Sequence, residues 1–260
     1  MKSLALITRD FRRLWQSKGL LVMTFIQPVA YLLIFAVMFA RQFGDVLLQG
    51  RQIPYLVFII PGLVALQSYQ AFHTQLSLSS GDRRWGILLV ITIAGLRPSE
   101  YVFGQVAARG LLAALQSFII LAVGLALTGI PSIWIVSLPR LLLAAAAWIS
   151  STLLWASLGL LIGIRLLSER KRDVLWALFN LPVMFTSSVF YDVETGPMAI
   201  RLASRLNPLT YCANAIRSSV FLEPIDAIVP TALLAGAGIV TVLAACLVVG
   251  ATALDRQPGG

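Results

Sequence analysis

The chain has 260 residues, of which 58% are hydrophobic and 12% are charged, and its mean hydropathy is +0.87. Soluble domains carry about 25% charged residues, so this composition excludes an ordinary soluble protein. A net charge of +9 would suggest nucleic-acid binding in a soluble protein, but in a membrane protein it reports topology. We therefore expect an all-α integral membrane protein with a single domain over residues 1–260.

The first 18 residues predict an amphipathic helix at the membrane interface. Apolar side chains recur at spacings of three and four and so share one face: Leu4, Ile7, Phe11, Leu14 and Trp15. Arg9, Arg12 and Arg13 lie on another face. Such a helix is either a topology anchor alone or a docking surface for a cytoplasmic partner. We expect no cleavable signal peptide, because the first apolar run begins only after 19 residues and is too long.

Six apolar stretches follow, each near the length that crosses a bilayer. The clearest, residues 20–40, contains no charge, and about 20 residues span the hydrocarbon core. Because lipid offers the backbone no hydrogen-bond partner, each stretch predicts a helix in which occasional prolines are tolerated. The expected spans are residues 20–40, 55–77, 106–130, 141–164, 174–191 and 228–254.

The distribution of Lys and Arg predicts the orientation of these spans. Fourteen of the 20 basic residues fall in the N-terminal segment, around the segments after spans two and four, and at the C-terminus. The opposite side holds six. Positive residues accumulate on the cytoplasmic side, so both termini are expected in the cytoplasm.

Two connecting segments are unusual. Residues 85–96, WGILLVITIAGL, are uncharged but too short to span, so we expect a partly buried cytoplasmic segment within a loop over residues 80–105. Residues 192–226 are external by topology yet apolar, and Pro208 divides them. They predict two short helices, which either dip into the outer half of the membrane or belong to an ordinary surface loop. In the first case Asn207 would cap the second helix.

Several other features receive structural interpretations. The motif formed by Gly159 and Gly163 favours close helix packing within the chain over a dimer seam. His73 is expected to be a hydrogen-bonded interior residue, and Arg109 to reach the interface with its long side chain. Cys212 and Cys246 are interpreted as inert thiols.

No catalytic or energy-using motif is present. The sequence contains no G-x-x-x-x-G-K-[ST] phosphate loop, no H-E-x-x-H and no convincing pair of catalytic carboxylates. We therefore expect no catalytic, metal-binding or cofactor-binding residue in this chain. Membrane spans without an energy-using site suggest a subunit that another protein drives.

The order of elements and two segments resemble the permease subunits of type-2 ABC exporters, the family that exports drugs, polysaccharides and lipid-linked glycans. The first segment, residues 81–105, is GDRRWGILLVITIAGLRPSEYVFGQ, and its closing motif consists of Arg97, Glu100, Tyr101 and Gly104. The second runs from PVMFTSS to NPLTYCANAIRSSVF. Its matching positions are Pro182, Phe185, Ser187, residues 207–211, Ile216 and Arg217.

This resemblance implies a mechanism and a set of site residues. Two permeases would form the pathway in the inner (cytoplasmic) membrane, and two cytoplasmic ATPase subunits would bind ATP and Mg²⁺. The loop after span two would act as a coupling helix, flanked by the N-terminal helix. The expected ATPase contacts are Arg9, Arg12, Arg13, Asp82, Arg83, Arg84, Gly86, Leu88, Leu89 and Glu100. The expected external gate consists of Arg205, Asn207, Pro208, Tyr211 and Arg217.

Alternatives remain at this point. A secondary transporter would need ionisable residues within its spans, and a membrane enzyme acting on lipids would need clustered Asp, His or Ser. The exported substrate could be a hydrophobic drug-like molecule or a lipid-linked glycan. The permease could pair with itself or with a paralogue. The expected partners are therefore the ATPase, a second permease and membrane lipids, and no nucleic acid.

Overall fold

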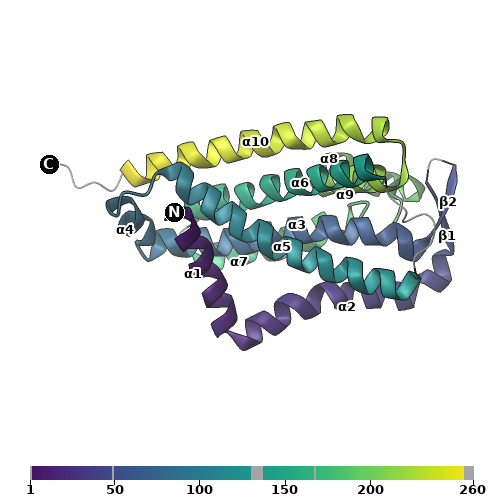
Figure 1. Ribbon diagram of the computed structural model, residues 1–260, viewed down its shortest axis with the longest axis horizontal. Helices are drawn as coiled ribbons and strands as arrows, with labels where there is room; N and C mark the ends of the chain where they lie inside the picture. Colours follow the sequence, from purple (N-terminus) through teal and green to yellow (C-terminus); the bar gives the residue numbers. More distant parts are fainter. Residues whose placement is uncertain (1, 49, 130–136, 167, 255–260) are drawn as a thin grey trace.

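The computed structural model describes residues 2–48, 50–129, 137–166 and 168–254, and nearly all of them are helical (Figure 1). Helices α1 (Lys2–Gln16) and α2 (Lys18–Phe43) precede a hairpin of β1 (Asp45–Leu48) and β2 (Arg51–Pro54). The next helices are α3 (Tyr55–Arg84), α4 (Ile87–Ile93), α5 (Pro98–Thr128), α6 (Leu138–Arg165) and α7 (Glu169–Phe185). A 3₁₀ turn (Val193–Thr195) leads to α8 (Met198–Leu206), α9 (Pro208–Phe221) and α10 (Pro224–Leu254).

Helix α3 forms the centre of the bundle and is buried along most of its length. Helix α6 packs closely against it because Gly159 and Gly163 remove side chains from the contact. A Cβ atom on Gly159 would collide with the carbonyl oxygen of Phe72, and one on Gly163 with that of Leu76. The prediction that this glycine motif packs helices within the chain is therefore confirmed.

Four helices of the described chain are long and apolar enough to cross a membrane: α3, α5, α6 and α10. They correspond to four of the six expected spans. In α2 only a shorter apolar stretch, Val22–Phe35, was found, and α7 has 17 residues. Large apolar side chains along α10, such as Leu233, Val240 and Leu247, are exposed, which suits a surface in contact with lipid.

Two of the spanning helices extend beyond their expected ends. Helix α3 continues to Arg84 and α5 begins at Pro98, although the apolar runs suggested ends at residues 77 and 106. The extensions persist because their polar side chains, including Ser79, Ser80 and Asp82, are buried against other helices. The loop expected over residues 80–105 is thereby reduced to α4 and the short turns around it.

The bundle has two distinct ends (Figure 1). At the left end of the figure lie α4, the start of α5 and the end of α10, and α1 crosses the bundle nearby. Helix α1 turns sharply into α2 at Ser17. The β-hairpin, α8 and α9 lie at the right end.

The hairpin was not anticipated, since its strands have four residues each and show no extended alternation. It pairs Val46 opposite Ile53. Arg51 from β2 donates to the carbonyl oxygen of Phe221 at 2.9 Å and so connects the hairpin to α9.

Candidate functional site

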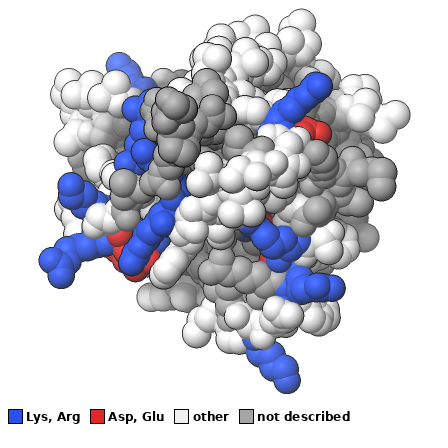
Figure 2. Space-filling view, turned by 90° about the vertical axis from the view of Figure 1, so that its left-hand side faces the viewer, with Lys and Arg blue, Asp and Glu red and all other residues white. Residues whose placement is uncertain are grey.

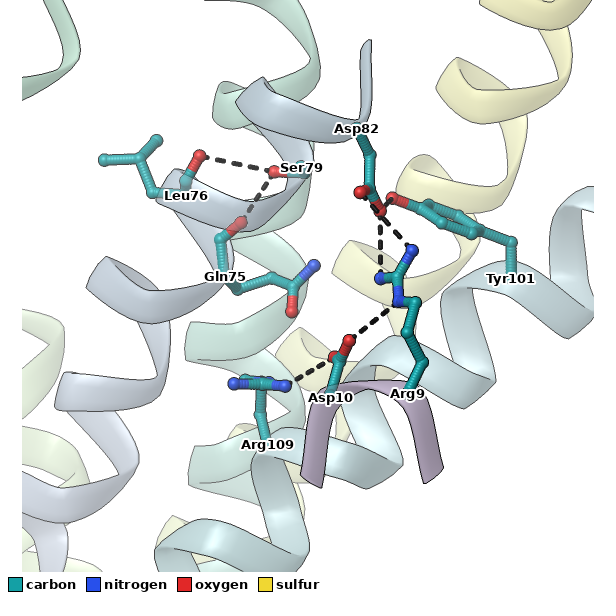
Figure 3. Close-up of polar contacts among 8 residues, drawn as sticks. All are labelled: Arg9, Asp10, Gln75, Leu76, Ser79, Asp82, Tyr101 and Arg109. Carbon is teal, nitrogen blue, oxygen red and sulfur yellow. Dashed lines mark hydrogen bonds and ion pairs between the residues drawn. The ribbon is translucent and has the colours of Figure 1, made fainter. Parts of the chain in front are cut away.

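Five polar side chains join α1 to the neighbouring ends of α3 and α5 (Figure 3). The two terminal nitrogens of Arg9 donate to the two carboxylate oxygens of Asp82, at 3.4 and 3.2 Å. Arg9 Nε donates to Asp10 at 3.0 Å, and the other oxygen of Asp10 accepts from Arg109 at 2.5 Å. The Tyr101 hydroxyl donates to Asp82 at 2.9 Å. We call these five residues the polar cluster.

The polar cluster is shielded from solvent although it contains four formal charges. The exposed fraction is 3% for the side chain of Asp10, 6% for Asp82 and 7% for Arg109, whereas Arg9 retains 35%. Burial by itself lowers the pKa of Arg9, but the carboxylates of Asp82 and Asp10 outweigh it and hold that pKa above its usual value. Charged groups are tolerated inside a protein when they are paired, and here two cations balance two anions.

The start of α5 is formed by the motif that closes residues 81–105, which consists of Arg97, Glu100, Tyr101 and Gly104. Pro98 occupies the first turn, where its missing N–H costs nothing. The carboxylate of Glu100 accepts from the backbone N–H of Arg97 at 2.8 Å and so caps the helix. The next residue, Tyr101, is buried and reaches Asp82. Glu100, expected among the ATPase contacts, therefore has a structural partner in its own helix.

Helix α4 and its flanking residues divide into an inward and an outward face. Leu88 belongs to a core cluster with Tyr101, Val106 and Leu160, and Asp82 is held within the polar cluster. Both were expected to contact an ATPase, but their side chains face other parts of this chain. Exposed apolar side chains instead come from three residues that were not singled out: Trp85, Val90 and Ile93.

The remaining residues expected at the ATPase contact lie around this segment. Arg84 pairs with Glu169 at 2.8 Å and lies over the ring of Trp85, and Arg83 donates to the carbonyl oxygen of Ile164 at 2.5 Å. Gly86 and Leu89 are half-buried, and Arg12 is exposed. The side chain of Arg13 lies outside the described side chains, as do those of Leu4 and Leu14 on the apolar face of α1.

Figure 2 shows this end of the molecule, where Lys and Arg are distributed over the visible face and Asp and Glu are few. Exposed basic residues in α1 and at the ends or connections of α3, α5, α6 and α7 include Arg12, Arg84, Arg97, Arg165, Arg170 and Lys171. Lys and Arg gather at one end of the helices in membrane proteins, as the positive-inside rule states, and this face follows that pattern.

At the other end of the bundle, Asn207 connects α8 to α9. Its side-chain oxygen accepts from the backbone N–H of Leu209 at 3.0 Å, which confirms the predicted helix cap. Its amide nitrogen donates to the carbonyl oxygen of Val183 at 2.6 Å and to the Thr186 hydroxyl at 3.0 Å. Asn207 thus fixes the start of α9 against the end of α7, with Pro208 as the first residue of α9.

Arg217 of α9 belongs to the expected gate, and we expect its side chain to lie near headgroup level or to pair with Asp192, Glu194 or Glu223. In the described chain it forms no ion pair with any of these carboxylates. It is buried, it donates to Asn214 at 3.0 Å and to the carbonyl oxygen of Ser188 at 2.8 Å, and it lies over the ring of Phe58 at 3.9 Å. Carbonyl and aromatic groups satisfy it instead. Glu223, one of its expected partners, contacts Arg51 and Arg140.

Two further residues of the expected gate lie at the surface near α9. The Tyr211 hydroxyl donates to the backbone carbonyl of Arg205 at 2.7 Å. The Arg205 side chain is exposed.

The fold, the spanning helices and the basic end define a multi-pass α-helical membrane protein. The comparison with protein families then identifies it more closely: residues 2–221 match the ABC-2 type transporter family, and the chain belongs to that family. Two relatives, both named "Putative transport permease ycf38", come from Porphyra purpurea and Cyanophora paradoxa. The first is 25% identical over 82% of this chain and 72% of its own length. The second is 28% identical over 82% of this chain and 71% of its own length.

Membership makes the chain a transport component of an ABC transporter, a class in which an ATPase partner supplies the energy.

Proposed function

We propose that this chain is the permease subunit of an ATP-driven exporter in the cytoplasmic membrane. Residues 1–260 act as one domain with both termini in the cytoplasm. The four long apolar helices, together with α2 and α7, make six spans. ATP and Mg²⁺ are bound by separate cytoplasmic ATPase subunits. The exported substrate is a hydrophobic drug-like molecule or a lipid-linked glycan.

The observation that carries this proposal is the link between α1 and the segment around α4. Asp82 lies five residues before α4, and Tyr101 lies four residues into α5. Both are bonded into the polar cluster that holds Arg9 of α1. A force applied to α4 from the cytoplasm is therefore transmitted to α1, α3 and α5 together. This is the property that a coupling element between an ATPase and a membrane pathway needs.

The exposed face of the α4 segment supports the same proposal. Trp85, Val90 and Ile93 present apolar surface at the end of the bundle that we place in the cytoplasm, and the basic side chain of Arg84 lies over the Trp85 ring. Apolar surface bordered by polar residues is typical of a protein interface. We assign these three residues, with Arg12 and Arg84, to the docking of the ATPase.

Dimer formation and the outer gate are further parts of the proposal. Helix α7 buries only Met184 among its side chains, and Leu178, Phe179 and Leu181 are exposed. Such a face suits a second permease, either a copy of this chain or a paralogue. Helices α8 and α9 are short and lie at the opposite end from α4, which suits two helices that re-enter the outer half of the membrane.

The test changes the exposed face of α4 without touching the core. Val90→Asp combined with Ile93→Asp should prevent copurification of the ATPase with the tagged chain and should abolish transport-coupled ATP hydrolysis. Leu138→Asp is the matched control, because Leu138 is also exposed at a helix end but lies at the start of α6, far from α4. Both variants should insert at normal levels. An inserted double variant that retains its ATPase and exports normally would overturn the assignment.

A further inference from the structure

A cavity of about 400 Å³ lies between α1, α2, α3 and α5, directly beside the polar cluster. Its volume falls within the ~300–1,000 Å³ of typical small-molecule sites. Asp10 and Arg109 of the polar cluster contribute to its wall, and Met23 and Gln27 of α2, both exposed, line another side. The cavity thus runs from the buried ion pair to the outer surface of α2. The V formed by α1 and α2 is visible in Figure 1.

The lining is rich in side-chain amides. Four glutamines line the cavity: Gln27, Gln67, Gln70 and Gln116. Amides are costly in an apolar interior unless they are hydrogen-bonded. Three of the four donate to their own chain, to the Tyr31 hydroxyl, the Leu63 carbonyl and the Thr24 carbonyl at 3.3, 3.2 and 2.9 Å. Within the described chain, the carbonyl oxygens of these three amides accept from no donor, so they can accept from a ligand.

Two buried donors beside the cavity also have no partner in the described chain. They are Nε2 of Gln70 and Nε of Arg109. Arg109 retains only 7% exposure, so water is a poor substitute for a partner. A buried donor without an acceptor costs about 1–3 kcal/mol, and a ligand oxygen would remove that cost. The cavity therefore offers both acceptors and donors.

The charge balance decides which class of ligand fits. Besides His73, whose ring stacks on Trp176 at 4.1 Å, the titratable groups among the described lining residues are Asp10 and Arg109. These two neutralise each other at 2.5 Å. A phosphate would bring an uncompensated negative charge into this surrounding, and it could only accept from the glutamines. A hydroxyl group both donates and accepts, and it is neutral.

We propose that this cavity binds a neutral, hydroxyl-rich group such as a sugar or polyol. The group could belong to the headgroup of a lipid or to a free glycoside. The proximity of the interfacial helix α1 favours headgroup depth. Binding itself does not depend on the proposed exporter function. If the bound group belongs to the exported molecule, which rests on that function, the substrate class narrows to a lipid-linked glycan.

The binding experiment uses native mass spectrometry on the purified full-length chain, in a detergent without a sugar headgroup. The probes are a diacylglycerol that carries one glucose, phosphatidylglycerol with the same acyl chains, and methyl glucoside. We expect the glucosyl lipid to bind, and Gln70→Leu to weaken it about fivefold through the loss of one hydrogen bond. Gln75→Leu is the matched control. Gln75 lies on the same helix and also has a buried, unpartnered amide nitrogen, but it does not line the cavity, so its replacement should leave binding unchanged.

Each outcome bears on the proposal. Methyl glucoside that binds with the same dependence on Gln70 supports the site and identifies free glycosides as ligands. The proposal is overturned if phosphatidylglycerol binds as well as the glucosyl lipid, or if Gln70→Leu leaves binding of the glucosyl lipid unchanged. Should Gln70→Leu fail to insert, Thr74→Val is read by the same criteria, because it removes a lining hydroxyl with almost no change in shape. No ATPase is present in this assay, so its failure leaves the exporter proposal standing, and loss of ATPase docking leaves this site standing.

Discussion

Replacement of Asp10 by Asn tests whether the polar cluster holds α1 against the bundle. The substitution conserves volume and removes one charge. Arg109, with 7% of its side chain exposed, then loses the one carboxylate that it contacts in the described chain. Breaking a buried pair by removing one partner costs about 3–5 kcal/mol, because the remaining charge is buried without compensation. We expect Asp10→Asn to lower the free energy of unfolding by that amount.

Asp82→Asn should cost less than Asp10→Asn. Its main partner, Arg9, is about one-third exposed and keeps its contact with Asp10, so water and the remaining carboxylate both compensate its charge. Asp173→Asn is the surface control. Asp173 is 62% exposed and pairs with the adjacent Arg172, and exposed pairs contribute about 0–1 kcal/mol.

The measurement is the unfolding of the solubilised permease by increasing SDS in mixed micelles, followed by tryptophan fluorescence. A double variant, Asp10→Asn with Arg109→Gln, should recover a substantial part of the loss, because it removes the charge left without a partner. The reasoning is refuted if Asp10→Asn behaves like Asp173→Asn, or if the double variant is as unstable as the two single effects added together.

Three further predictions concern packing, capping and topology. Gly159→Ala should cost about 1–3 kcal/mol by forcing α6 away from α3, whereas Gly236→Ala, where a Cβ meets nothing within 4 Å, should be neutral in the same SDS titration. Asn207→Ala should lower the unfolding free energy by about 1–2 kcal/mol, and Asn207→Asp should not restore it, because its carboxylate can cap α9 but would face the Val183 carbonyl oxygen that now accepts from the amide nitrogen. In a variant without native cysteines, a cysteine at Glu194 should react with an impermeant thiol reagent in intact cells, and one at Lys171 should not; labelling at Lys171 from outside would contradict the proposed orientation.

Much of the helical framework could be predicted from the sequence because lipid restricts the choices. An apolar run of bilayer length has to be a helix, and this rule found α3, α5, α6 and α10. The helix over the first 18 residues and the two helices on either side of Asn207 were also predicted. The β-hairpin was missed because four-residue strands give no periodic signal, and its register depends on the turn and on contacts to α9.

The contacts within the polar cluster were not predicted from the sequence. Arg9 and Asp82 were singled out for an external partner, and Arg109 was expected at the interface, but all three meet inside the protein. A signal was present. Asp10 is the one acid within the first 18 residues, and Arg109 is the one charge between Glu100 and Arg140. Isolated opposite charges in apolar helices suggest a pair, but periodicity within each helix cannot show that the two helices cross at those positions.

Asp10 and Arg109 belong both to the polar cluster and to the cavity wall, so movement of α1 affects both. Asp10 holds Arg9 with one oxygen and Arg109 with the other, and Arg109 also lines the cavity. If α1 moved away from α3 alone, the Arg9–Asp82 pair would break and the nearly buried carboxylate of Asp82 would lose its cation. Moving α1, α3 and α5 together avoids this cost in free energy. If α1 moved away from α5, Arg109 would lose its partner and the cavity wall would change. A ligand that satisfies Nε of Arg109 therefore favours the arrangement in which α1 is seated, and occupancy of the cavity is coupled to the position of the helix that we assign to ATPase docking.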